Sequence, residues 1–320
     1  LSLDRSLDFA AANAGRDALA GAWRGVLRAV RGGASFSDAV QRQPIFSAFT
    51  AAVLRAGEEG GSMDEALARL AGHHERSSEL AAKIRSALLY PMLMGIVAGA
   101  GVIVLLSVAV PRFVAMLGGV ESALPFTTRV LVAASGAVTG GWWVWAPLAV
   151  LAWLGWRGWL AQAGNRRRWH DLRLRLPVSG ALEGDLAAAR YCRALGVLLR
   201  GGVPVLSALR LARAVVGNDA LGARLDEATA AVARGDRVAE SLRGALPPLA
   251  GQLLAAGEES GRLDEMCGRV ADTLEGDVQR GLETLVRLLE PALIVVFGGV
   301  VGFIALAMLQ AMYSVNAGLG

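Results

Sequence analysis

Two pairs of adjacent carboxylates stand in nearly identical surroundings, at an offset of 200 residues. Residues 56–65 read AGEEGGSMDE and residues 256–265 read AGEESGRLDE, with seven of the ten positions identical. Paired carboxylates carry out general acid and base catalysis when both converge on one substrate. Glu58 with Glu59, and Glu258 with Glu259, are therefore the first residues to consider as a catalytic site.

A helical motif argues against that chemistry, because neighbouring residues on a helix point about 100° apart and cannot converge. A structural role accounts for the glycines: Gly57 and Gly257 allow close helix packing, while Gly61 and Gly261 permit a tight turn into the next helix. We therefore expect the four glutamates to serve the structure or to contact a partner protein. Charge reversal at Glu258 or Glu259 is expected to impair assembly with partner proteins more than it impairs the stability of the protein.

The turn of the first copy also has the spacing of a capping box. Ser62 and Glu65 are separated as in S-x-x-E, in which the two side chains bond reciprocally to the backbone amides of the first turn. Arg262 replaces the serine in the second copy, so this device is expected only once.

The other residues that could bind a metal or act as nucleophiles lack the neighbouring residues that such a site needs. His73 and His74 are adjacent, without a nearby cysteine or an HExxH spacing, and the lone Cys192 and Cys267 have no CxxC partner. No phosphate-binding GxxxxGK[ST] loop and no GxSxG nucleophile motif occurs in the sequence. The sequence predicts no enzyme activity, no metal site and no cofactor.

Composition indicates a membrane protein, since 54% of the 320 residues are hydrophobic. Three stretches without charge are long enough to cross a hydrocarbon core of about 30 Å as helices. They lie between Arg85 and Arg112, between Arg129 and Arg157, and after Glu290. No Asp, Glu, Lys, Arg or His lies inside them, which disfavours a small permease. Each contains a GxxxG that could serve as a packing face between spans or between protomers: Gly95 and Gly99, Gly136 and Gly140, Gly298 and Gly302.

Arginine placement predicts the orientation, because cationic loops stay on the cytoplasmic side. The second span is followed by an arginine cluster at positions 166, 167, 168, 173 and 175, whereas the connection 112–129 carries two arginines and Glu121. Residues 1–86 and 161–287 are thus expected inside and the C-terminus outside. The net charge of +4 and this cluster fit an anchor on anionic lipid better than a nucleic-acid site.

The two motif copies belong to a longer repeat. Tyr90-Pro91 matches Glu290-Pro291, so each copy leads into a span through a proline that is expected to kink its helix. The second copy begins earlier, with ARYCRALGVLLRGG at 189–202, so a first domain that begins before Leu1 is expected. Apolar residues recur every three or four positions, which predicts an all-α protein with two helical-bundle domains. The expected segments are a first domain at 1–87, two spans at 88–160, a second domain at 161–287 and a third span at 288–320.

These features resemble the inner membrane platform family of type II secretion systems and type IV pili, called the type II secretion protein F family. The resemblance covers the whole chain. It rests on the doubled motif, the order of the spans, and matching residues that include Pro91, Pro111, Pro177, Arg190, Gly202, Pro204 and Pro291. The sequence departs from the family pattern at Ala194, Ser179 and Glu290, and the last of these is expected to pair with Arg287.

The resemblance implies a non-enzymatic platform in the bacterial inner membrane, with cytoplasmic domains and a periplasmic C-terminus. The domains would contact a hexameric secretion ATPase and inner membrane assembly partners, and the spans would engage pseudopilins. A homodimer is expected. The run RRRWH at 166–170 favours the secretion branch, and the alternative is a type IV pilus platform.

Overall fold

The computed structural model describes residues 3–116, 125–176 and 179–318, and Pro177 therefore lies outside the described residues. These residues form α-helices and one π-helical turn, without a strand among them. The chain divides into two compact units, each described here by itself. Unit 1 comprises Leu1–Ala82 and Arg167–Gly281, and unit 2 comprises Lys83–Arg166 and Leu282–Gly320.

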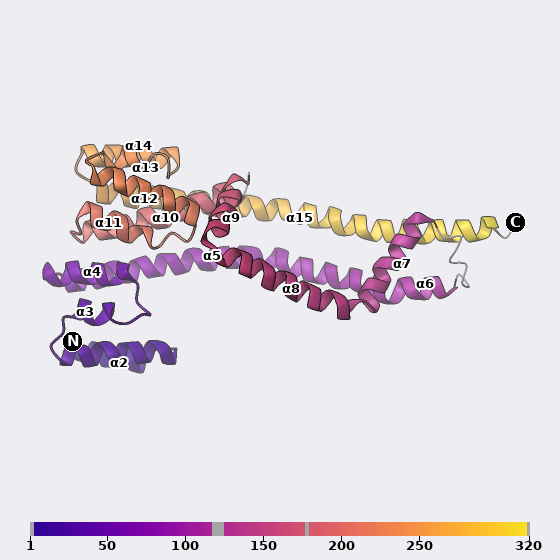
Figure 1. The fold of residues 1–320 in the computed structure, drawn as a ribbon, viewed down its shortest axis with the longest axis horizontal. Helices are drawn as coiled ribbons and strands as arrows, with labels where there is room; N and C mark the ends of the chain where they lie inside the picture. The colour runs from indigo at the N-terminus through magenta and orange to yellow at the C-terminus, as the bar shows by residue number, and fades with distance from the viewer. Residues whose placement is uncertain (1–2, 117–124, 177–178, 319–320) are drawn as a thin grey trace. The chain divides into compact units, whose positions relative to one another are not determined.

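The helices of unit 1 occur in two similar series (Figure 1). The first is α1 (Leu3–Ala12), α2 (Asp17–Arg31), α3 (Phe36–Gln41), α4 (Ala48–Glu59) and the start of α5 (Met63–Val104). The second is α10 (Ser179–Arg200), α11 (Val205–Arg213), α12 (Asp219–Ala233), α13 (Val238–Leu242), α14 (Pro248–Glu259) and the start of α15 (Leu263–Gly318). The helices α2 and α12 have 15 residues each, and α4 and α14 have 12 each, so the sequence repeat is also a repeat of helices.

One hydrophobic core runs through both series. Amphipathic helices bury their apolar stripes against each other, and α4 packs against α10 and α11 of the second series. Fully buried members of this core come from both repeats: Val26, Val40, Val53, Leu195, Leu198, Leu209, Leu225 and Leu254. The division into separate domains at 1–87 and 161–287 stays a prediction, because both repeats lie in unit 1.

The arginine cluster lies on α9 (Ala163–Arg175), with all of its members except Arg166 in unit 1. Two of its arginines form ion pairs there: Arg175 with Asp171 at 2.7 Å, and Arg173 with Glu183 of α10 at 3.0 Å. The side chains of Arg167 and Arg168 are exposed to solvent. Part of the cluster thus holds α9 in place, and the lipid-anchor role stays a prediction for its exposed members.

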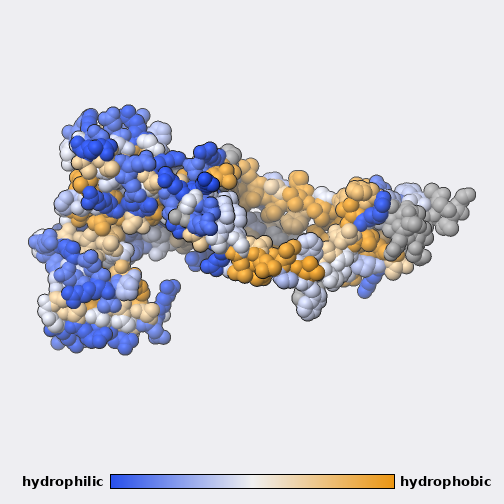
Figure 2. Space-filling model, viewed as in Figure 1, coloured by the Kyte–Doolittle hydropathy of each residue, from blue (hydrophilic) through white to orange (hydrophobic). Residues whose placement is uncertain are grey.

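The apolar stretches lie in unit 2, where Figure 2 shows hydrophobic side chains gathered along the long helices. Two helical stretches are long and apolar enough to cross a membrane, Met63–Met116 and Leu263–Ser314. Their helices continue through Pro91 and Pro291 without a break. The second predicted span is not one continuous helix. It consists of α7 (Phe126–Thr139) and α8 (Trp142–Ala161), and the chain bends by 78° between them.

Two glycines cause that bend. Gly140 ends α7 and Gly141 precedes α8, and glycine is the residue that most weakens a continuous helix. A Cβ atom at Gly141 would lie 2.8 Å from the Ala137 carbonyl oxygen. The bent pair provides a third crossing only if α7 and α8 together count as one span.

The first apolar stretch contains a π-helical turn, η1 (Leu105–Ala109), before α6 (Val110–Met116). Here the Val110 amide donates to the Leu105 carbonyl, five residues back. In the same pattern the Leu106 carbonyl would require the amide of Pro111, and proline has none. The hydroxyl of Ser135 on α7 donates to that carbonyl at 2.6 Å instead. The π turn and the proline thus leave one backbone acceptor for another helix, as an apolar environment requires.

In unit 2, α6, α7 and α15 meet at a small core of Val110, Leu131, Ile304 and Ala307. Beside it, the buried Thr128 hydroxyl of α7 donates at 2.8 Å to the Ala307 carbonyl of α15. The expected GxxxG packing faces do not lie within this core. A Cβ atom on either member of the first or third motif would meet nothing within 4 Å. Packing between protomers through these glycines stays a prediction.

Candidate functional site

The first glutamate of the motif caps a short helix in the first repeat. Glu58, at the end of α4, accepts hydrogen bonds from the Phe36 amide at 2.8 Å, the Ser37 amide at 3.1 Å and the Ser37 hydroxyl at 2.6 Å. These amides begin α3 and would otherwise lack partners within their helix. Burial opposes the charge, but the Ser37 hydroxyl and the two amides outweigh it and lower the pKa of Glu58.

Glu258 makes the same contact in the second repeat. At the end of α14, its carboxylate accepts from the Val238 amide at 2.8 Å and from the Ala239 amide at 3.0 Å. Both amides begin α13, the counterpart of α3. The first glutamate of each motif is thus engaged inside unit 1, and a carboxylate suits the positive end of a helix. We therefore expect reversal at Glu258 to lower the stability of unit 1 as well, and the larger effect on assembly stays a prediction.

The second glutamate of each motif faces solvent. Glu59 and Glu259 are exposed, and Glu259 pairs with Arg237 at 3.0 Å. The two carboxylates of each pair therefore point to different surroundings, one toward a helix terminus and one toward water. Such divergent carboxylates do not form an acid and base pair on one substrate.

Two glycines let the helices on either side of the motif approach closely. A Cβ atom at Gly57 would lie 2.4 Å from the Cβ of Ala66 on α5. In the second repeat, a Cβ atom at Gly257 would lie 2.7 Å from the Cγ of Met266 on α15. Real side-chain carbons do not approach this closely, so the helix pairing depends on glycine at both positions.

The turns after these helices also depend on glycine. Gly61 has a φ of +68° and Gly261 a φ of +70°, in the left-handed region that glycine adopts without strain. Gly202, between α10 and α11, has a φ of +81°, and Pro204 is the N-cap of α11. The capping box is not formed in this described turn, because Glu65 pairs with Arg69 at 3.3 Å.

A buried arginine joins the long helix α15 to the core of unit 1. Arg193 on α10 is 6% exposed, and it binds Glu275 at 2.8 Å and Asp272 at 2.6 Å. Sequence reasoning singled out the exposed Arg190 and missed Arg193. A signal was present, since Arg193 interrupts an apolar run of α10, and a buried arginine requires acidic partners.

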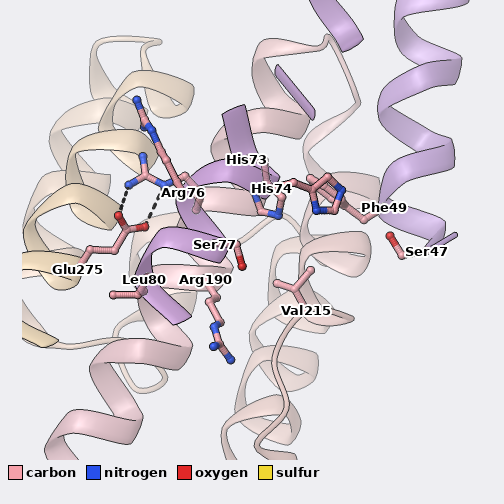
Figure 3. A pocket seen from close by; sticks show the side chains of 11 residues that line it. Ser47, Phe49, His73, His74, Arg76, Ser77, Leu80, Arg190, Val215 and Glu275 are labelled. Atoms are coloured by element: carbon pink, nitrogen blue, oxygen red, sulfur yellow. Dashed lines mark hydrogen bonds and ion pairs between the residues drawn. The ribbon is translucent and has the colours of Figure 1, made fainter. Parts of the chain in front are cut away.

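The two histidines and Arg190 line a cleft that we call the histidine cleft (Figure 3). Its volume is about 260 Å³, and it lies between α4 and α5 of the first repeat and the helices of the second. The His73 ring packs on Phe49 at 4.8 Å between centroids. Burial, followed by the neighbouring His74 and Arg193, lowers the pKa of His73 to about 4. His73 is therefore neutral at physiological pH.

The described residues offer little for metal or thiol chemistry. No group of three or more His, Cys, Asp or Glu side chains within them is placed to hold a metal ion. Cys192 and Cys267 are both free and buried. Burial raises the pKa of Cys192 to about 12 and also raises that of Cys267, so neither is a reactive thiolate.

At the start of the apolar stretches, equivalent positions of the repeat meet each other. The Tyr90 hydroxyl of α5 donates to the Glu290 carboxylate of α15 at 3.5 Å. The expected pairing of Glu290 with Arg287 is not formed among the described residues, where Tyr90 is the partner of this carboxylate.

Comparison with known proteins matches both copies of the repeat to one family. The family described as "Type II secretion system (T2SS), protein F" matches residues 1–111 and 191–311. Each matched region contains one motif copy together with all or most of the long helix that begins in it.

Individual relatives carry two kinds of name. The chain is 34% identical over 300 residues to the type IV pilus assembly protein PilC of Thermus thermophilus, covering 92% of this chain and 74% of that protein. It is 36% identical over 294 residues to the type II secretion system protein F of Xanthomonas campestris pv. campestris, covering 91% and 73%. The Aeromonas hydrophila protein F is 33% identical over 293 residues, covering 89% and 74%.

The matched regions contain the features that the structure explains in physical terms: the capping glutamates, the close-packing glycines and the helices that lead into apolar stretches. The family model and the individual relatives both match this chain over most of its sequence. The chain therefore belongs to the type II secretion system protein F family.

Proposed function

We propose that the protein is the inner-membrane platform of a bacterial type II secretion system, without enzymatic activity of its own. In this role it would couple a cytoplasmic secretion ATPase to the assembly of pseudopilins for protein export. Family membership supports the class of function. Several relatives bear the name of a secretion system protein, which supports the secretion branch.

One structural observation carries the coupling proposal. Both α5 and α15 begin within the last three residues of a motif copy and continue as helices into an apolar stretch. Backbone hydrogen bonds stiffen a helix along its axis, so a displacement at the motif end would be passed on to the apolar end. The capping glutamates attach each motif firmly to its own repeat, as a coupling element requires.

The exposed glutamates are the proposed contacts with the ATPase. Glu59 and Glu259 lie at the start of the turns that lead into α5 and α15. A partner with basic side chains would be attracted to these two carboxylates, which are free of the capping role of their neighbours. The spans would contact the pseudopilins, the lipid bilayer and a second copy of the chain in a homodimer.

A type IV pilus platform is the second candidate. The relatives from Thermus thermophilus and Myxococcus xanthus are named type IV pilus assembly proteins, at 34% and 30% identity. The identities do not separate the branches. Deleting the gene distinguishes them, because a secretion platform is needed for export of proteins into the medium and a pilus platform is needed for surface pili.

Affinity purification of the full chain in detergent tests the platform itself. A secretion ATPase and pseudopilins should be recovered with the wild-type protein. The double reversal Glu59→Arg and Glu259→Arg should reduce ATPase recovery at least about tenfold, as expected for lost charge complementarity, with an unchanged melting temperature. Reversal of the exposed Glu227 on α12 is the matched control and should leave recovery unchanged. Full recovery with the double variant would exclude these contacts.

Orientation is a separate expectation of the same proposal. Both repeats should lie in the cytoplasm and the C-terminus in the periplasm of the bacterial inner membrane. Single cysteines introduced at Ser78 and near the C-terminus, in a variant with both native cysteines replaced, can be labelled with an impermeant maleimide on intact cells. Labelling of the terminal cysteine alone is the expected result.

A further inference from the structure

A second cleft in unit 1, which we call the arginine cleft, is lined mainly by basic side chains. Its volume is about 160 Å³. One wall is a face of α5 and the other a face of α10, with residues three, four or seven positions apart on each helix. The lining residues are Arg69, Gly72, His73 and Arg76 from α5, and Arg193, Val197 and Arg200 from α10.

The carboxylates around this cleft are fewer than its arginines. Glu65 pairs with Arg69, while Asp272 and Glu275 pair with Arg193. Asp272 also lies 3.8 Å from Arg76, a distance longer than a hydrogen bond. Arg200 donates from Nε to the carbonyl of its own helix at 3.3 Å and forms no ion pair within the described residues. The cleft thus keeps an excess of positive charge that a bound anion would balance.

Two buried polar atoms at the cleft lack a hydrogen-bond partner among the described residues. They are the Arg69 Nε and the His73 Nδ1 atoms, and both residues line the arginine cleft. A buried donor without a partner costs free energy, so native proteins generally satisfy such atoms. Because both residues line one cleft, a single acceptor-rich ligand bound there could satisfy both atoms.

We propose that the arginine cleft binds one phosphate group, held by its four arginines and by His73. Guanidinium groups match phosphate oxygens in geometry and charge and bind them with paired hydrogen bonds. A volume of this size holds about five water molecules, which is enough for a phosphate group. The bound phosphate links α5 of the first repeat to α10 of the second. The site is independent of the proposed secretion function.

Two sources supply this chemistry: a free phosphate or phosphomonoester, and the headgroup of a phospholipid. The full chain in a neutral maltoside detergent, titrated with inorganic phosphate at constant ionic strength, tests the first. The same protein in nanodiscs of phosphatidylcholine, with and without phosphatidic acid, tests the second. Binding is read as a saturable rise in melting temperature, because a ligand of the folded state stabilises it by mass action. Chloride at the same ionic strength should produce no such rise.

Variants tie the binding to the cleft. Arg200→Gln and Arg76→Gln should each weaken phosphate binding about tenfold, through the loss of a charge-assisted hydrogen bond. Gly72→Leu should abolish binding by filling the cleft. A Cβ atom at this position meets nothing within 4 Å, and replacing glycine inside a helix favours folding. Because Gly72→Leu leaves every arginine in place, it separates occupation of the cleft from the loss of charge.

Matched controls lie on other helices. Arg234→Gln removes an exposed arginine at the end of α12, and Gly21→Leu fills open space on α2. Both should bind phosphate like the wild type. A response to phosphate or to phosphatidic acid that Gly72→Leu and Arg200→Gln remove, and that both controls keep, supports the site. No response to either source, an equal response to chloride, or an unchanged response in Gly72→Leu overturns it.

Discussion

Glu58 accepts a 2.8 Å hydrogen bond from the backbone amide of Phe36, joining the end of α4 to the start of α3. The equivalent bond from Val238 to Glu258 is also 2.8 Å long. The motif that suggested acid and base chemistry therefore caps a helix in each repeat. Because only the first glutamate of each motif caps a helix, substitutions of the two glutamates should differ sharply in their effect on stability.

Replacing the capping glutamate Glu258 by alanine should destabilise the protein more than replacing its neighbour Glu259. Glu258→Ala is expected to lower the free energy of unfolding by about 1 kcal/mol, as for other lost helix caps. Glu259→Ala removes one exposed ion pair and should change it by less than about 0.5 kcal/mol. Thermal unfolding in detergent, followed by tryptophan fluorescence, measures both. Equal losses would contradict the capping role.

Acidification should destabilise the protein through His73. Its pKa is about 4 in the folded chain, against 6.5 for an ordinary solvated histidine, so between these values the unfolded state binds the additional proton. Stability should be fully present above pH 6.5 and fall as the pH decreases toward 4. Because part of the ring is exposed to solvent, the expected loss of unfolding free energy is on the order of 1 kcal/mol.

The groups that face His73 explain the direction of this effect. Arg193 faces it from α10, and Arg69, Arg76 and His74 share its helix, while Phe49 of α4 offers no charge. Glu275 also lines the histidine cleft, but it is bound to Arg193. His73→Gln should flatten the melting temperature between pH 5 and pH 7, whereas His74→Gln should retain the slope. A slope that survives in His73→Gln would assign the effect to other groups.

Removing the hydroxyl of Ser135 should leave the Leu106 carbonyl without a partner. Ser135→Ala is expected to destabilise the protein by about 1–3 kcal/mol, the cost of one buried unsatisfied acceptor. Ser107→Ala is the matched control, since that hydroxyl bonds at 3.4 Å to a carbonyl of its own helix. Its effect should be markedly smaller.

Proline supplies a second test of the same contact. Pro111→Ala restores an amide that can reach the Leu106 carbonyl, so Ser135→Ala should cost less in the Pro111→Ala background than alone. The difference is the coupling free energy of a double-mutant cycle, measured from melting temperatures and chemical denaturation in detergent. Additive effects would show that the two residues do not share this acceptor.

Exchanging a methyl group between two helices should reveal the packing at the first motif. Gly57→Ala would force a Cβ atom to within 2.4 Å of the Ala66 Cβ, and such overpacking costs about 1–3 kcal/mol. Adding Ala66→Gly moves the methyl group from α5 to α4 and should recover most of that loss, apart from about 1 kcal/mol of helix propensity. A double variant less stable than Gly57→Ala alone would argue against this contact.

The sequence predicted the features that depend on local pattern. Helical character follows from apolar residues at every third or fourth position, and the absence of charge marks the apolar parts of α5 and α15. The repeat itself predicted paired helices around each motif. The glycine turns at Gly61 and Gly261 could be anticipated because a left-handed backbone requires that residue.

Features that depend on distant contacts could not be predicted. The role of Glu58 is determined by α3, which lies 21 or 22 positions earlier in the chain. Arg193 meets acids 79 and 82 positions away, which periodicity cannot show. The break at Gly140 is instructive in another way, because hydropathy averages over a window and does not register the point where a helix ends.

The contact between Tyr90 and Glu290 has a consequence for how the two repeats diverged. A duplicated chain that brings a position against its own twin begins with two identical side chains facing each other. Two glutamates would repel each other there, and two tyrosines could share only a neutral hydrogen bond, which is weaker than one to a carboxylate. The present pair of one phenol and one carboxylate is complementary, so a change at either position would remove a contact that the other side depends on.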